Sequence, residues 1–144
     1  AAKEKLPAGP FDAILLIDCI YFLGEPGPLL KRLLPLLKPH GRILISAFQT
    51  REKGEPKTIL QADHTPIAQA LDAADLRWVS YDFSANVRKH WLSNYETTLA
   101  LKSDFLQEGN QFLFDARRAE NVPFKQHVDS DTISRFLYVI EVKS

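Results

Sequence analysis

Asp18 is the side chain in this sequence whose position most calls for a chemical explanation. It ends the run FDAILLID, which begins at Phe11 and has no polar alternation between Ala13 and Ile17. Such a run is typical of a strand buried on both faces. A carboxylate in this position must be compensated for lost hydration. Because α/β sheets bind ligands at the carboxyl ends of their strands, a binding role for Asp18 is favoured over a purely structural one.

A long helical pattern carries the second group of candidate side chains. It spans residues 86–108 and repeats an apolar or aromatic residue every four positions, at Val87, Trp91, Tyr95 and Leu99. Aromatic stripes at this spacing pack in a core more often than they form a ligand cage. Both interpretations stay open for Trp91 and Tyr95. If they do not contact a ligand, Arg88 is expected to be a surface charge and His64 a solvated loop residue.

Metal and phosphate motifs are weak in this chain. The four histidines share no ligand spacing with one another or with the single cysteine, Cys19, so no metal site is expected. One glycine cluster, the residues GEPG at 24–27, follows the first strand. Its proline suits the start of a helix better than a loop that cradles phosphate.

The elements that must position Asp18 form a strand, a helix and a second strand. The leucine-rich segment 28–37 has a wide apolar stripe, and Pro35 predicts a kink or an early end of this helix. The run GRILIS at 41–46 is another apolar strand. Two such strands joined by a crossover helix are typical of a parallel pair within an α/β sheet.

The rest of the chain predicts further covering helices and two more strands. Thr65 and Pro66 form a helix start, with a cap followed by proline at the first helical position. Strands are expected at 78–83 and 134–142, the latter inside the sheet because both of its faces are apolar. Between them, the long helix over 86–108 is followed by a short helix over 112–119 and an irregular stretch through Pro123.

Length and charge restrict the class of protein. The 144 residues suit one domain, in which 1–10 form a polar tether and 86–132 form a helical, lid-like insertion. Eighteen basic and eighteen acidic side chains cancel, which predicts binding to neither nucleic acid nor an anionic membrane surface. No apolar run is long enough to span a bilayer. One cysteine at the end of an apolar strand favours a reducing compartment, so a cytoplasmic location is expected.

These residues resemble a known family. The stretch FDAILLIDCIYFL, the leucine-rich helix and LLKPHGRILIS are similar to the carboxyl-terminal half of class I S-adenosylmethionine-dependent methyltransferases that act on small molecules. In that family an acid ends the fourth strand, and a lysine-proline-glycine-glycine turn precedes the fifth. Asp18 matches the acid, and the residues KPHG at 38–41 match the turn with one glycine replaced by histidine.

The resemblance implies a partial Rossmann-like α/β fold with covering helices. The chain would supply strands four to seven of the family sheet, in the order 4-5-7-6 with the last strand antiparallel. It also implies that Asp18, Cys19 and Tyr21 contact S-adenosylmethionine. The acceptor pocket would be roofed by the regions that carry His64, Arg88, Trp91 and Tyr95. The family's glycine-rich cofactor loop and its ribose-binding acid have no counterpart in this sequence.

Two functional hypotheses follow. In the first, the chain is a methyltransferase with a small-molecule acceptor, or the carboxyl-terminal half of one, truncated and inactive alone, with the cofactor loop removed or encoded elsewhere. In the second, it is a non-catalytic interaction or dimerisation module derived from a methyltransferase. The strand at 11–18 would be a long apolar edge, which proteins avoid exposing. We therefore expect a homodimer through this strand, or a separate amino-terminal half, to cover it.

Overall fold

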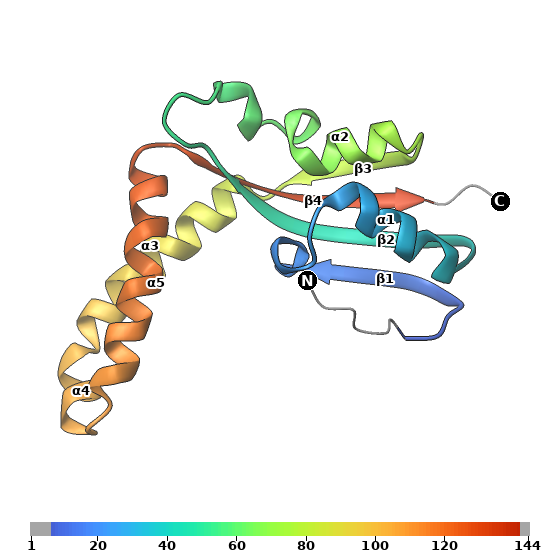
Figure 1. The fold of residues 1–144 in the computed structure, drawn as a ribbon. Helices are drawn as coiled ribbons and strands as arrows, with labels where there is room; N and C mark the ends of the chain where they lie inside the picture. The colour runs from blue at the N-terminus through green and yellow to red at the C-terminus, as the bar shows by residue number, and fades with distance from the viewer. Residues whose placement is uncertain (1–6, 142–144) are drawn as a thin grey trace.

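The computed structural model describes residues 7–141, which form a four-stranded mixed sheet with helices (Figure 1). Four strands make up the sheet: β1 (Phe11–Ile17), β2 (Leu37–Thr50), β3 (Arg77–Asp82) and β4 (Ile133–Glu141). The α-helices are α1 (Pro26–Leu33), α2 (Pro66–Ala73), α3 (Ser84–Ala100), α4 (Lys102–Gln107) and α5 (Gln111–Asp129). Short 3-10 helices are η1 (Ile20–Phe22), η2 (Leu34–Leu36), η3 (Lys57–Leu60) and η4 (Ala62–His64).

The strand order confirms the expected α/β class. The strands lie in the order β1-β2-β4-β3, with β1 and β2 parallel and β4 antiparallel to both of its neighbours. The last strand of the chain is therefore inserted between β2 and β3, as expected from its apolar faces. Consequently the carboxyl ends of β1 and β2 meet the amino end of β4 at one edge of the sheet, which we call the carboxyl edge.

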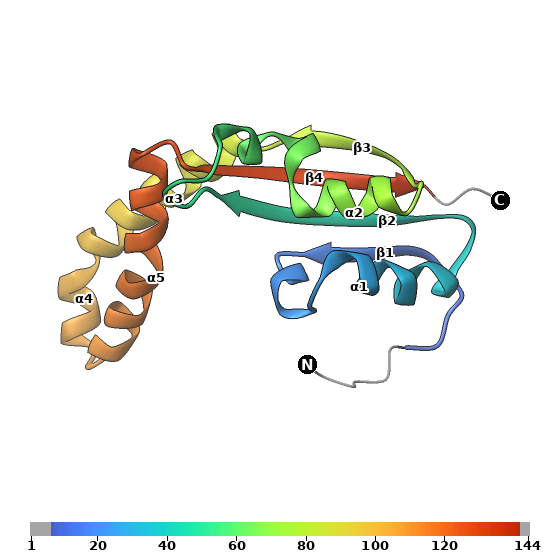
Figure 2. The same ribbon diagram turned by 45° about the horizontal axis from the view of Figure 1, so that its top comes forward.

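One face of the sheet is packed under helices. The amphipathic helices α1 and α2 lie on the same side, as Figure 2 shows. They cover side chains that include Leu16, Ile43, Ile45, Tyr138 and Ile140, each at most 7% exposed. Burial of this apolar area supplies the main stabilisation of the fold. We call this side of the sheet the covered face.

The other face of the sheet lacks such cover among the described residues. Strand register places Leu15, Leu44, Val139 and Val79 in one row across it, and Ile17, Ser46, Leu137 and Tyr81 in the next. Four of these large side chains are more than half exposed, namely Leu15, Ile17, Val79 and Tyr81. We call this side, defined by the two rows, the open face.

Helices α3, α4 and α5 form an arm that projects away from the sheet (Figures 1 and 2). The expected single helix over 86–108 is two helices, because the chain turns at Leu101. A helix does cover the expected range 112–119, but the irregular stretch expected after it is wrong, since α5 continues through Pro123 to Asp129. Contacts with α3 on both sides of Pro123 hold α5 helical where local sequence would interrupt it.

Candidate functional site

Asp18 lies at the carboxyl edge and pairs with a residue that the sequence pattern did not single out. Its carboxylate Oδ2 is 2.5 Å from Nη2 of Arg135 at the start of β4. The same guanidinium donates to the Ser46 hydroxyl on β2, at 3.1 Å from Nη2 and 3.3 Å from Nε. Three strands are thus joined by one polar network.

The backbone of Asp18 has a special conformation. Its φ angle is 50°, in the left-handed region that few residues other than glycine, asparagine and aspartate adopt readily. Its amide donates to the Ser46 carbonyl at 3.0 Å, which continues the β1–β2 ladder by one residue. Among the described residues no donor reaches the second carboxylate oxygen, Oδ1, and 42% of the side chain is exposed. The Oδ1 oxygen of Asp18 can therefore accept a hydrogen bond from a ligand.

Cys19 and Tyr21 follow Asp18, around η1. Cys19 is a half-buried free thiol. The Phe48 backbone amide donates to the Tyr21 hydroxyl, with 2.5 Å between nitrogen and oxygen. Burial raises the pKa of Tyr21 to about 12, despite the opposing effect of its hydrogen bond with the Phe48 backbone. The Tyr21 hydroxyl is thus occupied by the protein backbone and remains protonated near neutral pH.

A cavity of about 510 Å³ lies on the open face beside the arm. Its floor comes from the strands and its wall from Phe83 and the first turns of α3, and it is lined by Leu15, Ile17, Leu44, Ser46, Phe83, Asn86, Val87, His90, Arg135 and Leu137. Mostly apolar walls with a few polar groups are typical of sites that bind small molecules. Arg135 joins this cavity to Asp18.

The structure places the predicted acceptor residues outside the lining of this cavity. Arg88 donates to the Ile133 carbonyl at 3.1 Å and pairs with Asp131 at 2.7 Å, so it anchors α3 to the start of β4. Trp91 stacks on Phe124 of α5, with ring centroids 4.0 Å apart.

The remaining two predicted residues also contact neighbours within the protein. The ring of Tyr95 on α3 lies under the Lys125 ammonium of α5, which is 5.3 Å from the ring centroid. His64 belongs to η4 and contacts the Asp63 carboxylate at 2.8 Å. Its neighbour Thr65 bonds to Tyr138 on the covered face, so His64 lies on that side of the sheet.

The sequence pattern missed Arg135 and Ser46. Arg135 carries a charge within the otherwise apolar run SRFLYVIEV, which is the same kind of signal that singled out Asp18. Ser46 ends the apolar run of the second expected strand. Neither was identified, because only the sheet register brings both to Asp18.

Within residues 7–141, no group of three or more histidine, cysteine, aspartate or glutamate side chains converges to hold a metal ion. In the same part of the chain no helix combines the length and apolar character needed to cross a membrane.

Comparison with known proteins relates the fold to solved structures rather than to sequences. No family model matches the sequence. No curated protein matches it either. Phosphoethanolamine N-methyltransferase 2 of Haemonchus contortus, solved with phosphomonomethylethanolamine and S-adenosylhomocysteine, superposes with a TM-score of 0.75 at 15% identity, over 97% of this chain and 35% of the other.

Two further solved structures agree with this fold. The cyclopropane synthase MmaA2 of Mycobacterium tuberculosis has a TM-score of 0.72 at 11% identity, over 93% of this chain and 56% of the other. The chain has the fold of the S-adenosylmethionine-dependent methyltransferases. The [4+2]-cyclase SpnF also matches, with a TM-score of 0.68 at 17% identity, over 98% of this chain and 53% of the other. The chain spans between about a third and just over half of the lengths of these three structures.

Proposed function

We propose that this chain is the carboxyl-terminal part of an S-adenosylmethionine-dependent methyltransferase that acts on a small molecule. The observation that carries the proposal is the carboxylate of Asp18, held by Arg135 at the carboxyl edge of a sheet whose fold superposes on a solved methyltransferase. The fold alone does not decide the chemistry, since a [4+2]-cyclase shares it. The carboxylate favours a ligand with hydrogen-bond donors beside β1.

The handedness of strand crossovers predicts where an additional strand and helix would lie if the proposed amino-terminal part is present. The crossover from β1 to β2 carries α1 on the covered face. Crossovers between parallel strands are right-handed in nearly all proteins. A crossover that starts beside β1 and moves away from it therefore places its helix on the side of the sheet opposite α1. An additional parallel unit beside β1 would therefore cover both its free edge and the open face. Asp18 would then lie next to the point where the strand order reverses, which is where such sheets bind ligands.

Asp18, Cys19 and Tyr21 are the residues of this chain that we propose line the cofactor site. The free Oδ1 of Asp18 suits an ammonium or hydroxyl donor, both of which S-adenosylmethionine has. The bound cofactor would supply a sulfonium methyl group for transfer to the acceptor's lone pair. The protein contributes chiefly by holding donor and acceptor at reacting distance. A base is needed only for an acceptor that must lose a proton.

The acceptor would enter from the side of the arm. We propose that Asn86 and His90 offer polar contacts there, because both line the cavity that Arg135 joins to Asp18. Trp91 and Tyr95 lie on the same helix, and their contacts with α5 support a role in shaping this side of the site. Arg88 would act by anchoring the helix. His64, on the covered face, would take part only through loop movement.

Two aspartates at opposite ends of β1 provide a matched test of this proposal. In the protein expressed from its complete reading frame, Asp18→Ala should weaken S-adenosylmethionine binding about tenfold or more, through loss of a charge-assisted contact. Asp12→Ala is the control, because Asp12 is 84% exposed at the other end and, within residues 7–141, pairs with Lys38 alone. Calorimetric titration gives both affinities, and thermal melts confirm folding. Equal affinities for the two variants would assign Asp18 a structural role.

The alternative is a non-catalytic module that associates through β1. The observation that favours it is that β1 pairs only with β2 within the described residues, so its outer edge is free for a second copy. Antiparallel pairing of two such edges about a two-fold axis would make a homodimer through Phe11–Ile17. In that dimer the open faces of both copies lie on the same side of the continuous sheet and stay exposed to solvent. Light scattering of the 144-residue chain discriminates, since a dimer supports the alternative and a monomer contradicts it.

A further inference from the structure

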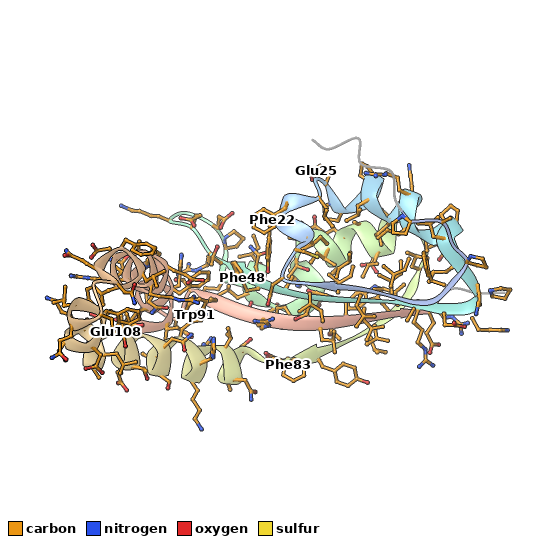
Figure 3. The ribbon with its side chains drawn as sticks, turned by 90° about the horizontal axis from the view of Figure 1, so that it is seen from below. Phe22, Glu25, Phe48, Phe83, Trp91 and Glu108 are labelled. Carbon is orange, nitrogen blue, oxygen red and sulfur yellow. The ribbon has the colours of Figure 1, made fainter. Side chains whose placement is uncertain are left out.

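Four aromatic rings connect the carboxyl edge to the arm in an unbroken series. Ring centroids are 4.6 Å apart for Tyr21 and Phe48, and 5.0 Å apart for Phe48 and Phe124. Phe124 and Trp91 stack with centroids 4.0 Å apart and planes parallel within 1°. The rings come from η1, β2, α5 and α3, and we call them the aromatic column. Figure 3 labels Phe48 and Trp91 in the region where the arm joins the sheet, and Phe124 contacts both of their rings.

The sheet fixes one end of the aromatic column. The Tyr21 hydroxyl accepts the Phe48 amide hydrogen and also lies 3.5 Å from the Phe48 carbonyl oxygen. This contact ties the segment after β1 to the end of β2. Tyr21 therefore holds its own ring, and the ring of Phe48, against the strands whose ends form the candidate site.

The other end of the aromatic column belongs to the arm. The arm is attached at its root, where Arg88 binds the Ile133 carbonyl and where the Ser84 hydroxyl accepts the Arg135 amide hydrogen at 3.0 Å. Beyond this root it projects free of the sheet (Figures 1 and 2). Trp91 directly follows His90, which lines the cavity. Whatever fixes Trp91 therefore also fixes the helix that walls the cavity.

We propose that Tyr21 is a positioning residue for the arm. Through Phe48 and Phe124 it holds α3 and α5 at one tilt relative to the sheet, and the tilt of α3 sets the width of the cavity. A ligand that displaces the Tyr21 ring would release this hold and change the cavity wall. The inference concerns packing alone, so it holds whether or not the complete protein transfers methyl groups.

Trp91 provides the measurement on the 144-residue chain. The sequence has two tryptophans, so Trp78→Phe leaves Trp91 as the single fluorescent reporter. In that background, Tyr21→Ala should change the acrylamide quenching constant of Trp91 by about twofold, because loss of a ring contact loosens the stack. Tyr21→Phe keeps the ring and should have a smaller effect. Phe22→Ala is the matched control, since Phe22 is 83% exposed and meets only the Tyr21 end of the aromatic column, edge-on with ring centroids 6.2 Å apart, so its loss leaves the four-ring series intact.

Hydrogen exchange tests whether Tyr21 positions the arm or only stabilises its own segment. Tyr21→Ala should speed amide exchange in α3 and α5, with circular dichroism confirming that the chain stays folded. If Tyr21→Ala unfolds the chain, Phe48→Leu replaces it in both measurements, because it removes the next ring of the aromatic column. Altered exchange confined to η1 and the end of β2, with unchanged Trp91 quenching, would overturn the proposal. Equal effects of Phe22→Ala and Tyr21→Ala would also overturn it.

Discussion

At the scale of single residues, the carboxyl edge combines one residue that the sequence predicts with one that it does not. Asp18 could be singled out because a carboxylate ends an apolar strand. Its partner Arg135 lies 117 positions away, and only the insertion of β4 beside β2 brings the two together. Local patterns therefore predict that Asp18 needs compensation, but not which side chain provides it.

Two tyrosines should make stability fall at high pH. Burial is the main cause that raises the pKa of Tyr21 and of Tyr138 to about 12, from an ordinary value of 10.0. The folded state favours the protonated phenols, so their stabilising contribution is full below pH 10 and is lost as pH rises through 12. We expect the free energy of unfolding to decrease across this range, as measured in urea.

Absorbance at the tyrosinate wavelength checks the same assignment. The protein should show late ionisation near pH 12, and Tyr21→Phe should remove part of it. If Tyr21→Phe leaves the rise in tyrosinate absorbance near pH 12 unchanged, Tyr21 does not ionise in that pH range.

At the scale of elements, the cap of α2 follows the prediction from the sequence, and the arm departs from it. Thr65 and Pro66 predicted the start of α2, and the Thr65 hydroxyl does accept the Ala68 amide hydrogen at 3.2 Å. Pro123 predicted a break, yet α5 continues through it. The Asn121 side chain donates to the Thr98 hydroxyl at 2.8 Å, and Phe124 stacks on Trp91. These contacts with α3 offset a helix penalty of about 3 kcal/mol, which no local pattern could reveal.

Thr65 should contribute more than an ordinary helix cap. Its buried hydroxyl caps α2 and also lies 2.7 Å from the Tyr138 hydroxyl, which joins the helix to β4. Thr65→Ala should lower the free energy of unfolding by about 2 kcal/mol, through loss of the cap and of this hydrogen bond. Thr65→Ser keeps the hydroxyl and should cost less than half as much. Chemical denaturation measures both variants, and similar losses would show that methyl packing matters instead.

At the scale of the whole molecule, the α-helices within residues 7–141 pack over one face of the sheet and leave much of the other exposed. The covered face is packed under α1 and α2, whereas Leu15 and Ile17 on the open face are 58% and 59% exposed. Large exposed apolar patches mark surfaces that bind another segment or molecule. Sequence reasoning predicted from the apolar pattern of the last strand that it lies inside the sheet, whereas the strand order was implied only by the family resemblance. It could not predict the cavity, since the approach of α3 to the sheet depends on contacts between distant residues such as Arg88 and Ile133.

Calorimetric titration with S-adenosylmethionine tests the central proposal most directly. The 144-residue chain should bind weakly or not at all, because Asp18 supplies one acceptor and the sequence has no glycine-rich cofactor loop. The protein from the complete reading frame should bind, and Asp18→Ala should weaken that binding. Micromolar affinity of the 144-residue chain alone, or no binding by the complete protein, would contradict the account.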